Sequence, residues 1–217
     1  MTPTSRTREA RIVGFGGHGR EVLDCLRRAG SDRTGDPFTV SIVHDEHQPD
    51  PVLLARHRVR WESGLPARSR PTYLGVGSGA ARRALAARTT AGLAVLDPAA
   101  AVGPTVSIGA GSIVFAFATV TVDVAIGRHV HIGRGAAVGH DCVLGDFVTV
   151  LPLASVSGNV RIGEGTTIGT GALIRQGVTI GRDAFVGMGA VVLDDVPDGT
   201  TVVGVPAVPL GRDPGGS

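Results

Sequence analysis

The sequence predicts two successive parts, a small α/β unit over residues 9–92 and a parallel β-helix over residues 93–210. Three observations support this prediction. Aliphatic residues recur at every sixth position of the second part, glycine is abundant at 33 residues, and aromatic residues make up only 4%. Many tight turns around small aliphatic side chains fit a narrow, repetitive interior. The first part instead alternates apolar strands with helical segments, which is typical of a parallel α/β sheet.

The expected α/β unit contains three strands and two helices. Strands are expected at residues 11–15, 38–43 and 73–76, where apolar residues cluster. Helices are expected over 20–29, whose apolar residues recur on one side, and over 80–87. We therefore expect a Rossmann-like domain with parallel strands.

A glycine-rich segment joins the first strand to the first helix. Free N–H groups at a helix start, together with the helix dipole, favour an anion there. The spacing of Gly14, Gly16 and Gly19 matches the dinucleotide fingerprint. The same spacing also fits a tight turn without any ligand. Because the unit is short for NAD, a mononucleotide or nucleotide sugar fits its length better.

The six-residue repeat determines the second part. Leu, Ile or Val occupies all seventeen positions taken six apart from Leu96 to Val192. Gly dominates one residue later, and Gly, Asp or Asn recurs three residues later, where a tight corner needs a left-handed backbone. Three hexapeptides then form an 18-residue coil with three flat faces, and stacked coils pair as parallel strands. A β-sandwich would require period-two alternation and irregular turn spacing, which this sequence lacks.

Composition argues against several classes of function. The net charge of +2, without a dense basic run, argues against nucleic-acid binding. Cys25 and Cys142 are too far apart for a CxxC metal pair and form no disulfide framework. The first eight residues are polar, and no apolar stretch approaches the length of a membrane span. We therefore expect a cytoplasmic protein with no membrane partner.

The segment His140-Asp141-Cys142-Val143-Leu144-Gly145-Asp146-Phe147 carries a family resemblance. It resembles the HDxxIGDF segment of the hexapeptide-repeat acyltransferases, in the branch of sialic-acid O-acetyltransferase-like and amino-sugar N-acetyltransferase enzymes. The glycine-rich opening and the stretches 96–99, 196–199 and 204–207 match in the same order. The resemblance implies a left-handed β-helix, acetyl-CoA as co-substrate, a nucleotide-sugar acceptor, and a homotrimer whose active sites are each shared by two subunits.

The resemblance also implies roles for individual residues. His140 stands two residues after the inward Val138, so it should face outward, and the matching family histidine is the general base. Asp141 would orient the imidazole, although Asp is common at such corners. The residues expected to bind the nucleotide-sugar substrate are Gly14, Gly16, Gly17, His18, Gly19, Asp45, Gly77 and Ser78. The residues expected to bind acetyl-CoA are Thr149, Gly169, Gly187, Ala207 and Arg212. Gly169, Gly187 and Ala207 are expected to do so through their backbone amides.

Two departures from the family pattern affect these expectations. Thr149 stands where the family often has a second histidine, so the acyl-CoA contact there must differ. His44-Asp45 replaces an acidic pair, which leaves nucleoside recognition open. No metal is expected, because no two histidines of the repeat have the five-residue spacing of the zinc-binding members.

Three functions remain open. The leading prediction is N-acetylation of a nucleotide-linked amino sugar. A sugar O-acetyltransferase, or an acyltransferase for a non-nucleotide acceptor, would use the same base. A non-catalytic β-helix scaffold belongs to another class, and failure to bind CoA would favour it.

Overall fold

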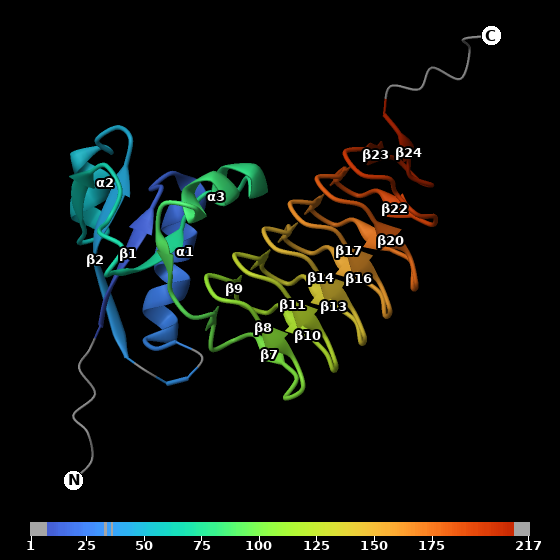
Figure 1. Ribbon diagram of the computed structural model, residues 1–217, viewed down its shortest axis with the longest axis horizontal. Coiled ribbons are helices and arrows are strands. Elements are labelled where there is room, and N and C mark those ends of the chain that lie inside the picture. The colour runs from blue at the N-terminus through green and yellow to red at the C-terminus, as the bar shows by residue number, and fades with distance from the viewer. Residues whose placement is uncertain (1–7, 33, 36, 211–217) are drawn as a thin grey trace.

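The computed structural model describes residues 8–32, 34–35 and 37–210, and it contains the two predicted parts (Figure 1). The N-terminal sheet is wholly parallel, with strand order β3-β2-β1-β4-β5. Its elements are β1 (Arg8–Val13), α1 (Gly17–Ala29), β2 (Phe38–Asp45), α2 (Pro51–Arg56), β3 (Arg60–Ser63), β4 (Pro71–Leu74), α3 (Gly79–Ala86) and β5 (Thr90–Ala91). The expected α/β architecture is confirmed.

Three elements of this unit were missed by the sequence patterns. Helix α2 has only six residues and none of them is buried, so it carries no apolar period. Strand β3 lies at the sheet edge and is mostly exposed, and β5 has two residues. The predicted helices and strands are present, with ends that differ by a few residues. Helix α1 ends as expected at Gly30, whose φ is 66°.

The second part is a parallel β-helix with three flat faces. The repeat is 18 residues, since Val95 pairs with Ile113 and the following coils keep this offset as far as β22; the last coil is two residues shorter, because Phe185 pairs with Thr201. Face A consists of β6 (Val95–Leu96), β9 (Ile113–Val114), β12 (His131–Ile132), β15 (Thr149–Val150), β18 (Thr167–Ile168), β21 (Phe185–Val186), β23 (Thr201–Val203) and β24 (Val208–Pro209). Face B consists of β7 (Ala101–Val102), β10 (Thr119–Val120), β13 (Ala137–Val138), β16 (Ser155–Val156), β19 (Leu173–Ile174) and β22 (Val191–Val192). Face C consists of β8 (Ser107–Ile108), β11 (Ala125–Ile126), β14 (Val143–Leu144), β17 (Arg161–Ile162) and β20 (Thr179–Ile180).

Each coil turns at three corners, AB, BC and CA, named by the faces that they join. The expected left-handed backbone occurs at Asp123, Asp141 and several glycines. It also occurs at Phe117 and Leu153, for which a positive φ costs roughly 1–2 kcal/mol. The coil geometry therefore imposes this conformation at the corner even on bulky side chains.

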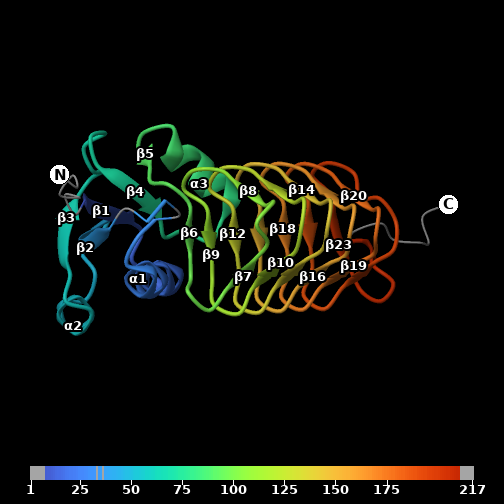
Figure 2. The same ribbon diagram turned by 90° about the horizontal axis from the view of Figure 1, so that it is seen from below.

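The α/β unit packs at one end of the stacked coils, with α1 and α3 toward them (Figures 1 and 2). It covers the outer side of face A, where Ile113, His131 and Thr149 are at most 2% exposed. Ile113 and Phe115 join the hydrophobic core of the α/β unit. The two parts therefore form one continuous structure, and the α/β unit lies on the A side of the first coils.

Within the described part of the chain, no helix is both long enough and apolar enough to cross a membrane.

Candidate functional site

His140 and Asp141 form an exposed pair at corner BC, between β13 and β14. Their side chains are 50% and 55% exposed, and His140 Nδ1 lies 2.7 Å from Asp141 Oδ2. A carboxylate can only accept, so Nδ1 carries a proton, and in the neutral imidazole Nε2 then has a free lone pair. The left-handed φ of 58° at Asp141 supports this contact by turning the chain directly after His140. The pair can therefore take a proton at Nε2 from a bound acceptor.

A cavity of about 610 Å³ opens at the carboxyl ends of β1, β2 and β4. Ligands of open parallel sheets bind at this edge. Two backbone amides hold the Asp45 carboxylate in place at this cavity. Its Oδ2 accepts from the Phe15 amide and its Oδ1 from the Glu46 amide, both at 2.8 Å. The lining residues are Val13, Gly14, Asp45, Glu46, Gly64, Leu65, Val76, Ala81, Ala84, Leu85 and Arg88.

The glycines of the loop before α1 serve two different purposes. A Cβ at Gly19 would lie 2.1 Å from the Gly14 carbonyl oxygen, so close packing of the loop requires this glycine. Gly16 and Gly17 are exposed, and a Cβ on either would meet nothing within 4 Å. The fold does not need glycine at these two positions. Their open backbone at the start of α1 is therefore available to an anionic ligand.

Gly77 and Ser78 contribute mainly to structure. The Ser78 hydroxyl caps α3 by accepting from the Ala81 amide at 3.3 Å. The Gly77 carbonyl accepts from Arg82 at 2.7 Å and from the Thr149 hydroxyl at 3.2 Å. Neither residue lines the large cavity, so their predicted contact with a substrate has no geometric support.

Arg82 is a fully buried residue that the sequence patterns missed, since a charged helical residue is normally predicted to be exposed. Its guanidinium donates to six neutral oxygens, and burial lowers its pKa to about 10. The six acceptors, at 2.7–3.1 Å, are the carbonyls of Val76, Gly77, His129, Phe147 and Val148 and the hydroxyl of Thr149. Arg82 thereby joins α3 to two coils of the β-helix.

The predicted acetyl-CoA contacts fare differently. The Thr149 side chain is buried and bonded to Arg82, which disfavours a contact with acetyl-CoA. The amides of Gly169, Gly187 and Ala207 donate to the carbonyls of Val186, Val202 and Val191, each at 2.8 Å. These three amides are already bonded within the β-helix and its C-terminal turn, and a contact of these residues with acetyl-CoA stays a prediction. Arg212 lies outside the described residues.

The partly buried His18 meets the buried His131 where α1 packs on face A. His18 Nε2 lies 2.8 Å from His131 Nδ1, and His18 Nδ1 lies 3.7 Å from a Glu21 carboxylate oxygen. Burial, with a smaller contribution from the Arg82 charge, lowers the pKa of both histidines. Both imidazoles are therefore neutral near pH 7, and Glu21 favours a proton on His18 Nδ1.

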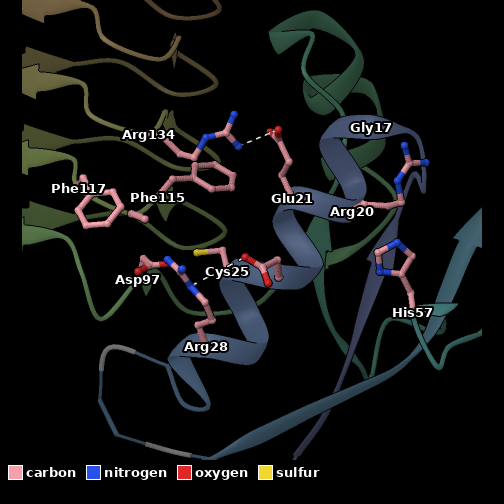
Figure 3. A pocket seen from close by; sticks show the side chains of 12 residues that line it. Gly17, Arg20, Glu21, Cys25, Arg28, His57, Asp97, Phe115, Phe117 and Arg134 are labelled. Carbon is pink, nitrogen blue, oxygen red and sulfur yellow. Dashed lines mark hydrogen bonds and ion pairs between the residues drawn. The ribbon is translucent and has the colours of Figure 1, made fainter.

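A second cavity, of about 550 Å³, lies between α1 and the first coils (Figure 3). Arg134 pairs with Glu21 at 2.7 Å, and Arg28 pairs with the buried Asp97. Arg20 has no carboxylate partner in the described ranges and reaches only the Phe15 carbonyl, at 3.4 Å. This cavity begins beside Gly17, so it adjoins the glycine-rich loop.

Two parts of the predicted site are far apart around the β-helix. The large cavity and His18 belong to the side of face A, which the α/β unit covers. His140 lies at corner BC, the corner of the triangular coil that is opposite face A. No three His, Cys, Asp or Glu side chains of the described residues are placed to hold a metal ion.

Comparison with known proteins identifies the class. Residues 141–176 match the family model described as bacterial transferase hexapeptide (six repeats). The chain is 34% identical to the acetyltransferase domain of PglB from Neisseria gonorrhoeae FA1090, with a TM-score of 0.79, over 94% of this chain and 100% of that chain. The chain is thus a member of the hexapeptide-repeat transferases.

Two further relatives identify the branch. A mutant of the perosamine N-acetyltransferase from Caulobacter crescentus, in complex with CoA and GDP-perosamine, is 31% identical, with a TM-score of 0.84, over 94% of this chain and 97% of that chain. The GDP-perosamine N-acetyltransferase of Escherichia coli O157:H7 is 36% identical over 112 residues, so the chain matches about half of that relative's length (51%). The chain belongs to the family of nucleotide-amino-sugar N-acetyltransferases, as its motifs predicted.

Proposed function

We propose that this protein transfers the acetyl group of acetyl-CoA to the amino group of a nucleotide-linked amino sugar. The observation that carries the proposal is the His140–Asp141 pair, with a free Nε2 on an exposed corner. GDP-perosamine, which is bound in the Caulobacter structure, is the first acceptor to test. Acetyl-CoA and nucleotide sugars are made in the cytoplasm, so we place the reaction there.

The reaction needs one base. The neutral amine of the acceptor attacks the thioester carbonyl carbon, and the carbonyl electrons move onto oxygen. His140 Nε2 takes the proton that the nitrogen loses, while Asp141 stabilises the imidazolium through Nδ1–H. The C–S bond then breaks, and the imidazolium returns the proton to the CoA sulfur. The products are the N-acetylated sugar and free CoA.

We further propose that two copies of the chain form each active site. Within one copy, the cavity anchored by Asp45 and the base His140 lie on opposite sides of the β-helix, so a second copy must supply one of them. Corner AB supports an association of copies, because the apolar residues Phe117 and Leu153 are 73% and 68% exposed there. A closed threefold ring would pair each cavity with the base of a neighbour.

A thiol-release assay tests the chemistry. Purified protein, acetyl-CoA and GDP-perosamine, with UDP- and dTDP-linked amino sugars as alternatives, should release CoA. His140→Ala should lose about 10²–10⁴-fold in kcat. Gln176→Ala, an exposed position two coils further along the same corner, is the matched control and should retain activity. Wild-type turnover in His140→Ala would eliminate the proposed base, and a protein that neither turns over an acceptor nor binds CoA would favour a scaffold.

Mixing two inactive variants tests the shared site. His140→Ala keeps the cavity, whereas Asp45→Ala keeps the base. After the two variants are unfolded and refolded together at equal amounts, roughly a quarter of wild-type turnover should return, because one interface in four combines both intact parts. No recovery, in mixtures whose mass by light scattering is that of the wild-type assembly, would place the whole site in one copy.

A further inference from the structure

Gly158 occupies an unusual place in the column of residues that contains His140. Residues 18 apart share the second position of corner BC in successive coils, and Gly158 is directly next to His140 in this column. Gly158 is buried, whereas the other members are exposed. Those other members are Pro104, Val122, His140, Gln176 and Asp194.

The backbone does not explain this glycine. The φ of Gly158 lies outside the left-handed region, so any residue can adopt its conformation. Proline, valine, glutamine and aspartate occupy the same position in other coils, so the β-helix accepts side chains there. Something specific to this coil therefore requires the absence of a side chain.

The imidazole of His140 is what fills the space. A Cβ at Gly158 would lie 2.5 Å from both Nε2 and Cε1 of His140, and 3.0 Å from Cδ2. A Cβ at residue 158 would thus lie over the face of the ring near Nε2 and Cε1, so this face rests on the Gly158 backbone, while the in-plane Nε2 lone pair stays open and Nδ1 binds Asp141. One methyl group at residue 158 would have to displace the ring.

We infer that Gly158 is a positioning residue that holds the His140 imidazole in its catalytic orientation. The ring is fixed by two contacts, the Asp141 carboxylate at Nδ1 and the bare backbone of the next coil against one face of the ring. A side chain at 158 would tilt Nε2 away from the acceptor or break the bond to Asp141. The catalytic role that we infer for Gly158 rests on the proposed function, whereas its effect on the position of the His140 ring does not.

Gly158→Ala tests the inference in the full-length protein. We expect the melting temperature, the oligomeric mass and acetyl-CoA binding by calorimetry to stay as in the wild type, because alanine fits the backbone. The kcat should fall on the order of 10²-fold, as a misplacement of about 1 Å can cause. Gln176→Ala controls for changes in surface at the same corner. Wild-type kcat in Gly158→Ala would overturn the inference.

NMR of the imidazole separates this inference from the proposed function. With the His140 signals assigned from His140→Ala, the wild type should show the tautomer protonated at Nδ1, and Gly158→Ala should shift these signals. This result is expected even if no sugar is acetylated, in which case the proposed function alone fails. Unchanged His140 signals would overturn the inference. So would loss of acetyl-CoA affinity with unchanged signals, since Gly158 would then serve the co-substrate.

Discussion

Arg82→Met should loosen the contact between the α/β unit and the β-helix. Methionine keeps the length and apolar stem of arginine but removes every donor. Three acceptors, the carbonyls of Val76, His129 and Phe147, then lose the only hydrogen bond that the described residues give them. The carbonyl of Val148 keeps a bond from the His131 amide.

The magnitude follows from these three oxygens. Each buried, unpaired carbonyl costs about 1–3 kcal/mol, which gives roughly 3–9 kcal/mol. The wild type, however, buries the Arg82 charge without a carboxylate partner among its six bonds, and removing that charge recovers part of the loss. We therefore expect a net destabilisation of about 3 kcal/mol, at the lower end of the range.

Urea unfolding measures the effect in the relevant domain. Trp61, the single tryptophan of the chain, lies in β3, so its fluorescence reports the α/β unit, while circular dichroism reports mainly the β-helix. The Trp61 transition of Arg82→Met should move to lower urea. Arg83→Met is the matched control, because Arg83 forms partly exposed ion pairs with Glu164 and Asp183, which contribute at most about 1 kcal/mol. If the Trp61 transition had the same urea midpoint in Arg82→Met and Arg83→Met, the stabilising role of the Arg82 hydrogen bonds would be refuted.

Two other changes have defined outcomes. Burial lowers the pKa of His129 to about 4. Between about pH 6.5 and pH 4 the unfolded chain therefore binds a proton that the folded chain does not. As the pH falls through this window, the protein should lose on the order of 3 kcal/mol of the stability that it has above it. His129→Asn, which suits the φ of 54°, should flatten the dependence of melting temperature on pH there, and an unchanged slope would contradict the assignment. Asp141→Asn should lower kcat less than His140→Ala does. Asp123→Asn, at the same corner position one coil earlier, should leave kcat unchanged. If the two asparagine variants had equal effects on kcat, the role of Asp141 would be purely structural.

The sequence predicted what depends on local periodicity. Inward aliphatic residues at six-residue spacing fixed the strands of the β-helix, because each face needs only its own hexapeptide to choose which side chain points inward. The same spacing placed His140 outside, and the structure gives it the expected carboxylate partner. Local patterns were enough because these features depend on neighbours in the coil.

What the sequence did not predict depends on contacts between distant parts. Arg82 was missed because its six acceptors come from the loop before α3 and from coils more than forty residues later. Thr149 and His131 share the outward position of face A with exposed residues of later coils, such as Phe185, and only the packing of the α/β unit buries them. A glycine motif also does not tell whether its N–H groups are already bonded, as those of Gly169 and Gly187 are.

These contacts also separate two kinds of damage to the enzyme. The α/β unit holds the large cavity, and Arg82 fixes that unit on face A, so loosening it should weaken the binding of the nucleotide sugar. The base lies on a corner that Arg82 does not touch. Arg82→Met should therefore raise the KM of the acceptor with a smaller change in kcat, whereas Gly158→Ala should lower kcat and leave that KM unchanged. If both variants changed the same parameter, the cavity and the base would act as one rigid unit, and the division of the site between face A and corner BC would be wrong.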